Sequence, residues 1–409
     1  MEGRLCYNLC SKGEFMKRFS TFLLSLLLFV SSLPLFSALA AAGGYEGDIT
    51  RKCLVKIEGS AKSKEMIFDR MYKSFWRIEK KHTRSLTIKL SKDFSKGGLY
   101  LCWAEKPESW KLYSGKELVA ESDDKGFHHE YVPLEQNYDE LRLEIKAGEK
   151  RYCGLSELFI TEGEEPPKWV QRWEPTLEKA DIMVVAAHPD DELLFMGGTI
   201  PYYANIEKRP MVICYLTMAN NMRRSEMLNG LWRMGVKNYP VIGHFRDIST
   251  RNKATLYQKW GGKNKVNAFM VELFRKYQPK VVVSHDVNGE YGHRAHMIAA
   301  EVVQFAAKNS GKEGVFKASA EKYGTHEISK LYLHLYSKNK IQLNWQEKYE
   351  ELDGLSPLEL AGLAFKLHRS QQKNHYMGKN RLYNTEAFGL AYTSVGADEK
   401  KNNFFENVE

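Results

Sequence analysis

Cysteine is scarce in this sequence and is never arranged as a metal-binding or redox pair. The chain has six cysteines among 409 residues, and none of them forms a CxxC motif. This spacing excludes the common thiolate zinc sites and dithiol redox motifs. Internal repeats and low-complexity segments are absent as well.

The sequence also lacks a basic arm and a nucleic-acid recognition motif. Its formal net charge is +9, but the lysines and arginines are scattered along the chain, as on a solvated surface. We therefore expect no nucleic-acid partner. Hydrophobic residues make up 43% of the chain, which is typical of a packed protein, and the length suits two or three domains.

The first 40 residues have the pattern of a signal peptide. Met16-Lys17-Arg18 is a basic start, Phe22–Leu39 is almost wholly apolar, and Ala38-Leu39-Ala40 is a small-x-small cleavage pattern. The alternative is a transmembrane anchor, but Pro34 and the alanine-rich end favour cleavage. No cysteine lies at the cleavage point, which argues against a lipoprotein. We expect a secreted or cell-surface protein without stable membrane insertion, and its basic charge suits an anionic cell-wall or surface polymer.

Residues 44–161 alternate short β-like runs with polar turns. Ser85–Leu90 and Glu140–Ile145 alternate apolar and polar residues, which predicts half-buried strands of a β-sandwich. The pattern resembles the discoidin-like sandwiches that often bind carbohydrate, although an inert spacer fits equally well. Five residues are candidates for stacking on sugars, with core packing as the alternative for at least two: Trp76, Trp103, Trp110, Tyr113 and His128.

A polar, proline-bearing linker at 162–175 separates this region from an α/β domain at 176–375. There, near-continuous apolar strands alternate with helical patterns, which predicts a Rossmann-like parallel sheet covered on both faces. The last segment, 376–409, is expected to pack on this domain as a C-terminal extension. The predicted strands are 181–187, 211–217, 241–242 and 281–283, and the predicted helices are 223–235 and 266–277.

Two polar clusters directly follow strands of this domain. They are His188-Pro189-Asp190-Asp191 and the run Ser284–His296. Ligands of open parallel sheets collect at the carboxyl ends of the strands, so the clusters are expected to meet there. His188, Asp191 and one later histidine supply the three ligands of a catalytic zinc site, although such a set also suits Fe²⁺. Turn formation, helix capping and surface histidines are the alternatives.

Together the clusters resemble the LmbE-like (PIG-L) N-deacetylases, with an HPDDE-type loop and a later G-H-x-x-H motif. The resemblance covers roughly 173–371. It implies that His188, Asp191 and His296 bind zinc. It also implies Asp190 as the general base, His293 as oxyanion stabiliser or general acid, and Tyr291 as a residue placed over the intermediate.

Two weaker matches suggest substrate contacts. Arg223 lies in an R-x-x-E stretch, and Asp247 follows an arginine in a loop whose aspartate holds sugar hydroxyls in the family. For Arg223 the alternative is a helix-surface ion pair with Glu226. The chain departs from the family at Arg294 and Ala295, where relatives often have proline and an acidic residue, and this affects the orientation of His293.

The resemblance implies a hydrolase that removes the acetyl group from an N-acetylated sugar. A zinc amidase for another acylated amine and a non-catalytic glycan-binding protein are the alternatives. One structural expectation follows from the cysteines: Cys53 and Cys153 lie near the two ends of the predicted sandwich, so they are the pair expected to form a disulfide.

Overall fold

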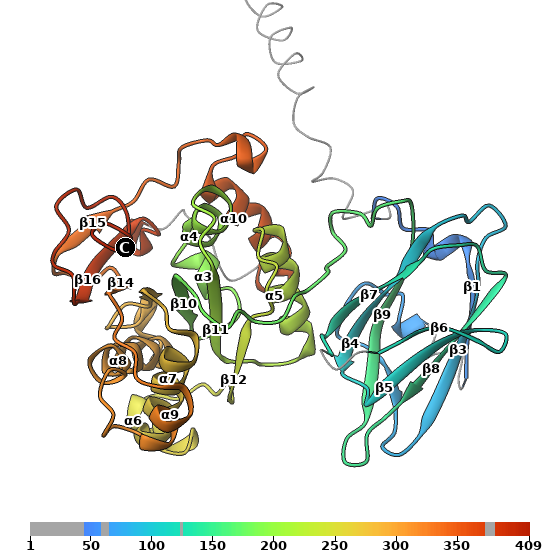
Figure 1. The fold of residues 1–409 in the computed structure, drawn as a ribbon, viewed down its shortest axis with the longest axis horizontal. Helices are drawn as coiled ribbons and strands as arrows, with labels where there is room; N and C mark the ends of the chain where they lie inside the picture. The colour runs from blue at the N-terminus through green and yellow to red at the C-terminus, as the bar shows by residue number, and fades with distance from the viewer. Residues whose placement is uncertain (1–44, 59–64, 123–125, 373–380) are drawn as a thin grey trace, which may run out of the picture. The chain divides into compact units, whose positions relative to one another are not determined.

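The computed structural model describes residues 45–58, 65–122, 126–372 and 381–409 (Figure 1). The predicted signal peptide and Gly44 lie outside these residues. Internal contacts group Ile49–Glu409 into one unit. Among the described residues, no helix combines the length and apolar content needed to span a bilayer.

The N-terminal part of this unit is an all-antiparallel β-sandwich, as predicted. In β8, Leu141, Leu143 and Ile145 are buried and alternate with more exposed polar residues, so only one face of the strand enters the core. One sheet has the order β1 (Leu54–Ile57), β3 (Thr83–Lys89), β8 (Glu140–Lys146), β5 (Ser109–Ser114), β6 (Glu117–Glu121). The other has the order β2 (Trp76–Ile78), β9 (Cys153–Glu162), β4 (Gly97–Glu105), β7 (His129–Leu134). Their inner faces share one hydrophobic core.

The predicted Cys53–Cys153 disulfide is wrong in this structure, because Cys153 carries a buried free thiol. The short helix η2 (Thr50–Lys52) contacts the far end of β9, where the Thr50 hydroxyl accepts the Ile160 N–H at 2.9 Å. Seven residues of strand separate Ile160 from Cys153, a distance of roughly 23 Å. Three residues from Thr50 to Cys53 are too few to cover it.

The α/β domain contains a seven-stranded sheet. Its order is β12 (Val241–Phe245), β11 (Met211–Thr217), β10 (Ile182–Ala186), β13 (Val281–Ser284), β14 (Lys330–His334), β16 (Ala387–Thr393), β15 (Lys340–Gln342). The first five strands are parallel, as predicted.

The prediction of a parallel sheet is wrong at one edge, because β16 pairs antiparallel with both β14 and β15. The C-terminal segment therefore completes the sheet, where the sequence suggested only packing on the domain. β16 takes up the backbone hydrogen bonds that β14 would otherwise leave open at an edge.

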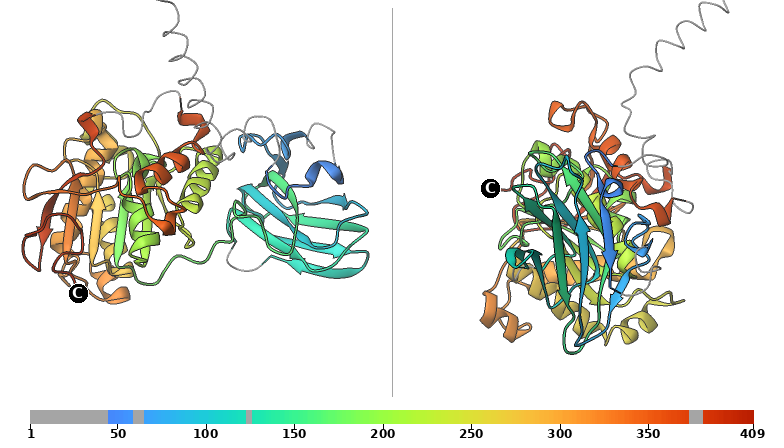
Figure 2. Two further views of the ribbon diagram at one scale, coloured as in Figure 1. Left: turned by 90° about the horizontal axis from the view of Figure 1, so that it is seen from above. Right: turned by 90° about the vertical axis from the view of Figure 1, so that its right-hand side faces the viewer.

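Helices cover both faces of this sheet, and each face has its own hydrophobic core (Figure 2). On one face lie α3 (Asp191–Leu194), α4 (Thr199–Pro201), α5 (Asn221–Arg233) and α10 (Pro357–Phe365). On the other lie α6 (Lys253–Lys259), α7 (Lys263–Tyr277) and α8 (Arg294–Asn309), with α9 (Lys317–Tyr323) against α7. The shorter helical turns are η3 (Tyr202–Ile206), η4 (Glu290–Gly292), η5 (Glu350–Leu352), η6 (Arg369–Gln371) and η7 (Arg381–Tyr383).

Candidate active site

The loop between β10 and α3 is held by its own carboxylates. The apolar strand β10 ends at Ala186, and the Asp191 carboxylate accepts the backbone N–H of His188 at 2.7 Å. Asp190 has a φ of 103°, a strained value for a residue other than glycine, and its N–H donates to Glu192 at 3.0 Å. The loop thus turns tightly enough to bring His188, Asp190 and Asp191 to the carboxyl end of the strand.

Asp191 lies at the centre of a cluster of histidines. Its Oδ2 is 3.1 Å from Nδ1 of His188 and 3.4 Å from Nε2 of His285, and its Oδ1 is 3.3 Å from Nε2 of His296. Burial alone would raise the pKa of Asp191, but His296 and His188 hold it well below its usual range. Asp191 is therefore an ionised carboxylate shared between the two parts of the site.

His296 comes from the second cluster, in the first turn of α8. Its Nδ1 lies 2.7 Å from Oε2 of the buried Glu290, whereas its Nε2 is buried and has no hydrogen-bond partner. Since a carboxylate can only accept here, Nδ1 donates to Glu290. Nε2 faces Asp191 and is the ring nitrogen that a metal ion would use.

Glu290 is a functional candidate that the sequence analysis did not single out. It is fully buried and contacts Nδ1 of three histidines: His285 at 2.8 Å, His296 at 2.7 Å and His334 at 2.7 Å. Burial opposes the charge of Glu290, but these histidines keep its pKa well below the usual value. A glutamate directly before Tyr291 in the polar cluster was the only local signal, because His334 comes from β14.

The side chains present fit a metal ion. Two overlapping groups among the described residues have donor atoms close enough to share one: His188, His293, His296, and Asp191, His285, His296. The predicted set of His188, Asp191 and His296 takes members from both. It is not itself one of these groups, and it stays a prediction. Asp191 contacts His188 through Oδ2 at 3.1 Å and His296 through Oδ1 at 3.3 Å.

Asp190 pairs with Arg223. Its Oδ1 is 3.1 Å from the guanidinium, which also donates to the carbonyl of Pro189. Burial and the nearby charge of Asp191 raise the pKa of Asp190 well above its usual value, and Arg223 opposes the shift. The alternative pair of Arg223 with Glu226 does not form, because Glu226 accepts the N–H and hydroxyl of Ser370 instead.

His293 and Tyr291 line the same site. The His293 ring stands edge-on to that of His188, with centroids 4.7 Å apart. Burial and the neighbouring histidines lower the pKa of His293 to about 3, so the ring is neutral. Its Nδ1 is buried without a hydrogen-bond partner among the described residues. Tyr291 is 54% exposed, and its ring lies 5.5 Å from that of His296.

Asp247 follows β12 and contacts His188. Its Oδ1 is 3.7 Å from Nε2 of His188, and its side chain is 38% exposed. The eight residues predicted as metal ligands, catalytic residues and substrate contacts of the α/β domain are thus connected by contacts at one edge of the sheet. The arrangement offers metal ligands, a separate buried carboxylate and a neutral imidazole within one cluster.

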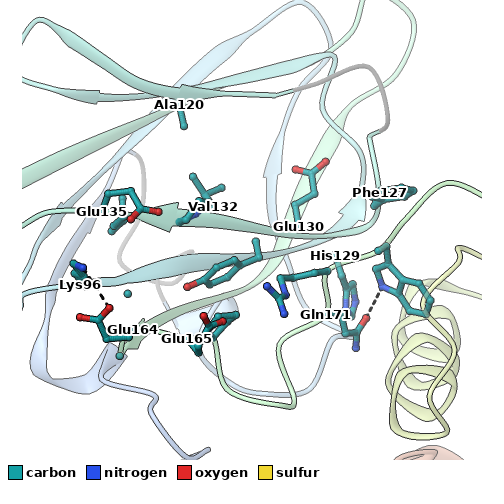
Figure 3. A pocket seen from close by; sticks show the side chains of 18 of the residues that line it. Lys96, Ala120, Phe127, His129, Glu130, Val132, Glu135, Glu164, Glu165 and Gln171 are labelled. Atoms are coloured by element: carbon teal, nitrogen blue, oxygen red, sulfur yellow. Dashed lines mark hydrogen bonds and ion pairs between the residues drawn. The ribbon is translucent and has the colours of Figure 1, made fainter. Parts of the chain in front are cut away.

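A pocket lies between the sandwich and the segment that follows it (Figure 3). Residues of β7 and the segment 163–173 line it, and Glu130 accepts the indole N–H groups of Trp103 and Trp110 at 3.0 and 2.7 Å. Of the five predicted sugar contacts, only Trp110 lines this pocket. Trp76 and Trp103 are buried in the sandwich core.

Comparisons with known proteins match parts of this chain. The family model of GlcNAc-PI de-N-acetylase (PIG-L) matches residues 183–307. A 1D-myo-inositol 2-acetamido-2-deoxy-alpha-D-glucopyranoside deacetylase of Salinispora arenicola is 28% identical over 177 residues, covering 37% of this chain and 57% of that protein. A deacetylase of the same description from Saccharopolyspora erythraea is 30% identical over 166 residues, covering 31% and 53%.

Among solved structures, N,N'-diacetylchitobiose deacetylase from Pyrococcus horikoshii matches with a TM-score of 0.37 and 19% identity. The match covers 49% of this chain and 74% of that one. The chain spans about half the length of the curated relatives it matches.

Proposed function

Residues 183–307 form a domain of the PIG-L family, and from this premise we propose that the chain is a secreted, zinc-dependent hydrolase that removes the acetyl group from an N-acetylated sugar. The curated relatives are named as deacetylases of an acetamido-glucopyranoside, which supports an N-acetylglucosamine-type substrate. Export, zinc and the roles of individual residues are parts of this proposal.

One observation carries the proposal more than any other. Asp190 and Asp191 are neighbours, yet Asp191 faces His188 and His296 while Asp190 faces Arg223. A metal-assisted amide hydrolase needs both a carboxylate ligand and a separate carboxylate to receive a proton. The different partners of Asp191 and Asp190 support this division of roles.

The residues have the following roles in the proposed reaction. His188, Asp191 and His296 would hold the metal, which when bound supplies Lewis acidity and lowers the pKa of water to roughly 7. Asp190 receives the proton of the attacking water, with Arg223 fixing its carboxylate. His293 is a neutral N–H donor suited to the developing oxyanion. Asp247 and Tyr291 lie where they can contact the sugar.

Acetate release tests the function directly. We expect the purified chain to release acetate from N-acetylglucosamine compounds, and a chelator to abolish this. A panel of acetylated glycans and acylated amines, followed by mass spectrometry, separates a sugar deacetylase from an amidase. Binding of a glycan without a net loss of about 42 mass units, the change when hydrogen replaces one acetyl group, would instead indicate a non-catalytic glycan-binding protein.

Export through residues 1–40 is the proposed route to the substrate. We expect the secreted chain to begin near Ala41, after the small-x-small pattern. N-terminal sequencing of the exported protein checks this. An intact start at Met1 or Met16 on membrane-bound protein would indicate an anchor.

A further inference from the structure

Helix α5 contacts both the catalytic loop and the β-sandwich. Its first turn carries Arg223, whose guanidinium pairs with Asp190. The next residue, Arg224, donates to the carbonyl of Ala104 in β4 of the sandwich. Adjacent residues of a helix project about 100° apart, so one turn can hold two different neighbours. The helix therefore links a sheet outside the PIG-L match to the proposed general base.

The contacts between α5 and the sandwich are specific and buried. The Ser225 hydroxyl lies 3.1 Å from Nε2 of His129, and Nδ2 of Asn221 donates to the carbonyl of Tyr72 at 2.5 Å. His129 is fully buried and fixed on its other side, where Nδ1 lies 2.8 Å from the hydroxyl of Tyr100. Removing one partner of such a buried hydrogen bond lowers stability, because the other partner is left buried without a hydrogen bond.

A second set of contacts lies just beyond the end of α5. Nδ1 of His128 is 2.8 Å from the hydroxyl of Tyr239, and the Phe127 ring stacks on Tyr239 with centroids 5.0 Å apart. These residues come from the segment that enters β7 of the sandwich. The start of α5 and the segment that follows its end thus both contact the sandwich.

At the catalytic loop, Arg223 holds α5 through two contacts. Arg223 contacts both the carboxylate of Asp190 and the carbonyl of Pro189. Asp190 has the strained φ of 103°, which persists only where the surroundings enforce it. A shift of α5 would move Arg223 away from this loop and allow the carboxylate of Asp190 to reorient.

We propose that the β-sandwich holds α5 in place against the catalytic loop, and that Arg224, Ser225 and His129 are positioning residues acting through Arg223 on Asp190. This inference rests on the proposed deacetylase function, in which Asp190 is the general base. In this proposal the sandwich affects the rate of the reaction, whereas an inert spacer would not.

The test uses the full chain with Arg224→Ala, the milder Ser225→Ala and the matched control Arg233→Ala. Arg233 is an exposed arginine at the other end of the same helix. A misplacement of about 1 Å can cost on the order of 10²-fold in rate, so we expect Arg224→Ala to lower kcat by about 10- to 100-fold with little change in KM. Arg224→Lys should recover part of the loss, and Arg233→Ala should match the unaltered chain.

The double variant Arg223→Ala/Arg224→Ala distinguishes positioning from general structural damage. If Arg224 acts through Arg223, the double variant should be no slower than Arg223→Ala alone. Losses that multiply would overturn the proposal, and so would an unchanged kcat in both Arg224→Ala and Ser225→Ala.

Hydrogen–deuterium exchange gives a readout that does not depend on activity. We expect Arg224→Ala, but not Arg233→Ala, to speed exchange in the peptide that covers Ala187–Leu194. Unchanged exchange there would overturn the coupling. Faster exchange in a chain that releases no acetate from any substrate would support the coupling and contradict the proposed function.

Discussion

Asp190 differs from Asp191 in what it faces, although the two residues are adjacent. A turn with a left-handed Asp190 sends one carboxylate to the histidines and the other to Arg223. The pKa values of the two carboxyl groups are also shifted in opposite directions. Burial and the charge of Asp191 raise the pKa of Asp190, whereas the histidines lower the pKa of Asp191. One short motif thereby provides two chemically distinct carboxylates.

We expect Asp190→Asn to keep the metal and to lose most of the turnover. Asn preserves the shape of the side chain but cannot receive a proton, and removal of a general base costs on the order of 10²–10⁴-fold in rate. Acetate release and elemental analysis of the same sample measure the two properties. Near-normal turnover would assign the base to another residue, with Glu192 or His293 next in line.

Metal binding should depend on His188 and His296, the two histidines predicted as ligands. We expect His188→Ala and His296→Ala each to lower bound zinc well below one ion per chain, since either change leaves too few ligands for a tetrahedral site. The exposed His244 of β12, changed to Ala, is the matched control. Full zinc occupancy in both ligand variants would refute the assignment.

The candidate residues could be predicted because chemistry and topology agree locally. His188, Asp190 and Asp191 directly follow an apolar strand, and parallel strands share one functional edge. The partners of these residues were harder to see. Glu290 meets His334 across 44 positions, and nothing in the local pattern connects a strand-end histidine to that glutamate.

At the level of elements, Glu290 connects two strands and one helix. The histidines that it holds come from the end of β13, the start of α8 and the end of β14. Carboxylates that fix the orientation of metal-binding histidines typically contribute 10- to 100-fold to metal affinity. Glu290 is therefore expected to set the geometry of the site without contacting the metal.

We expect Glu290→Gln to weaken zinc binding by about 10- to 100-fold, because an amide can accept from fewer histidine N–H groups and carries no charge. Asp286→Asn is the matched control, since Asp286 lies in the same loop and its side chain accepts from Asn288. Competition with a chelating dye measures the affinity. Equal affinities in the two variants would mean that Glu290 has no such role.

Strand prediction succeeded where burial imposes a simple pattern. The continuous apolar run of β11 and the alternation of β3 and β8 gave strands close to those observed. The antiparallel edge was missed for a physical reason. Strand β16 is buried only in part, and its pairing with β14 joins residues more than 50 positions apart. No local pattern encodes such a pairing.

At the level of the whole molecule, the sequence predicts two domains but could not show that the sandwich contacts α5. The boundary was visible as a polar, proline-bearing stretch after β9. The contacts of Arg224 and Ser225 with the sandwich join residues about 100 positions apart, and each is unremarkable in its own segment. These contacts are therefore visible only in the folded chain.

A metal held by residues from β10's loop and from α8 should stabilise the folded chain as a whole. His296 is more than 100 positions from His188 and Asp191, so the unfolded chain has no comparable site. Free zinc at 100 times its Kd adds about 2.7 kcal/mol to the free energy of unfolding. For a domain of about 200 residues, each kcal/mol raises Tm by roughly 2–4 °C. We therefore expect zinc to raise Tm by roughly 5–11 °C, and a chelator to reverse it. His188→Ala should show no zinc-dependent rise, while His244→Ala should keep it. An equal rise in His188→Ala would place the stabilising zinc at some other site.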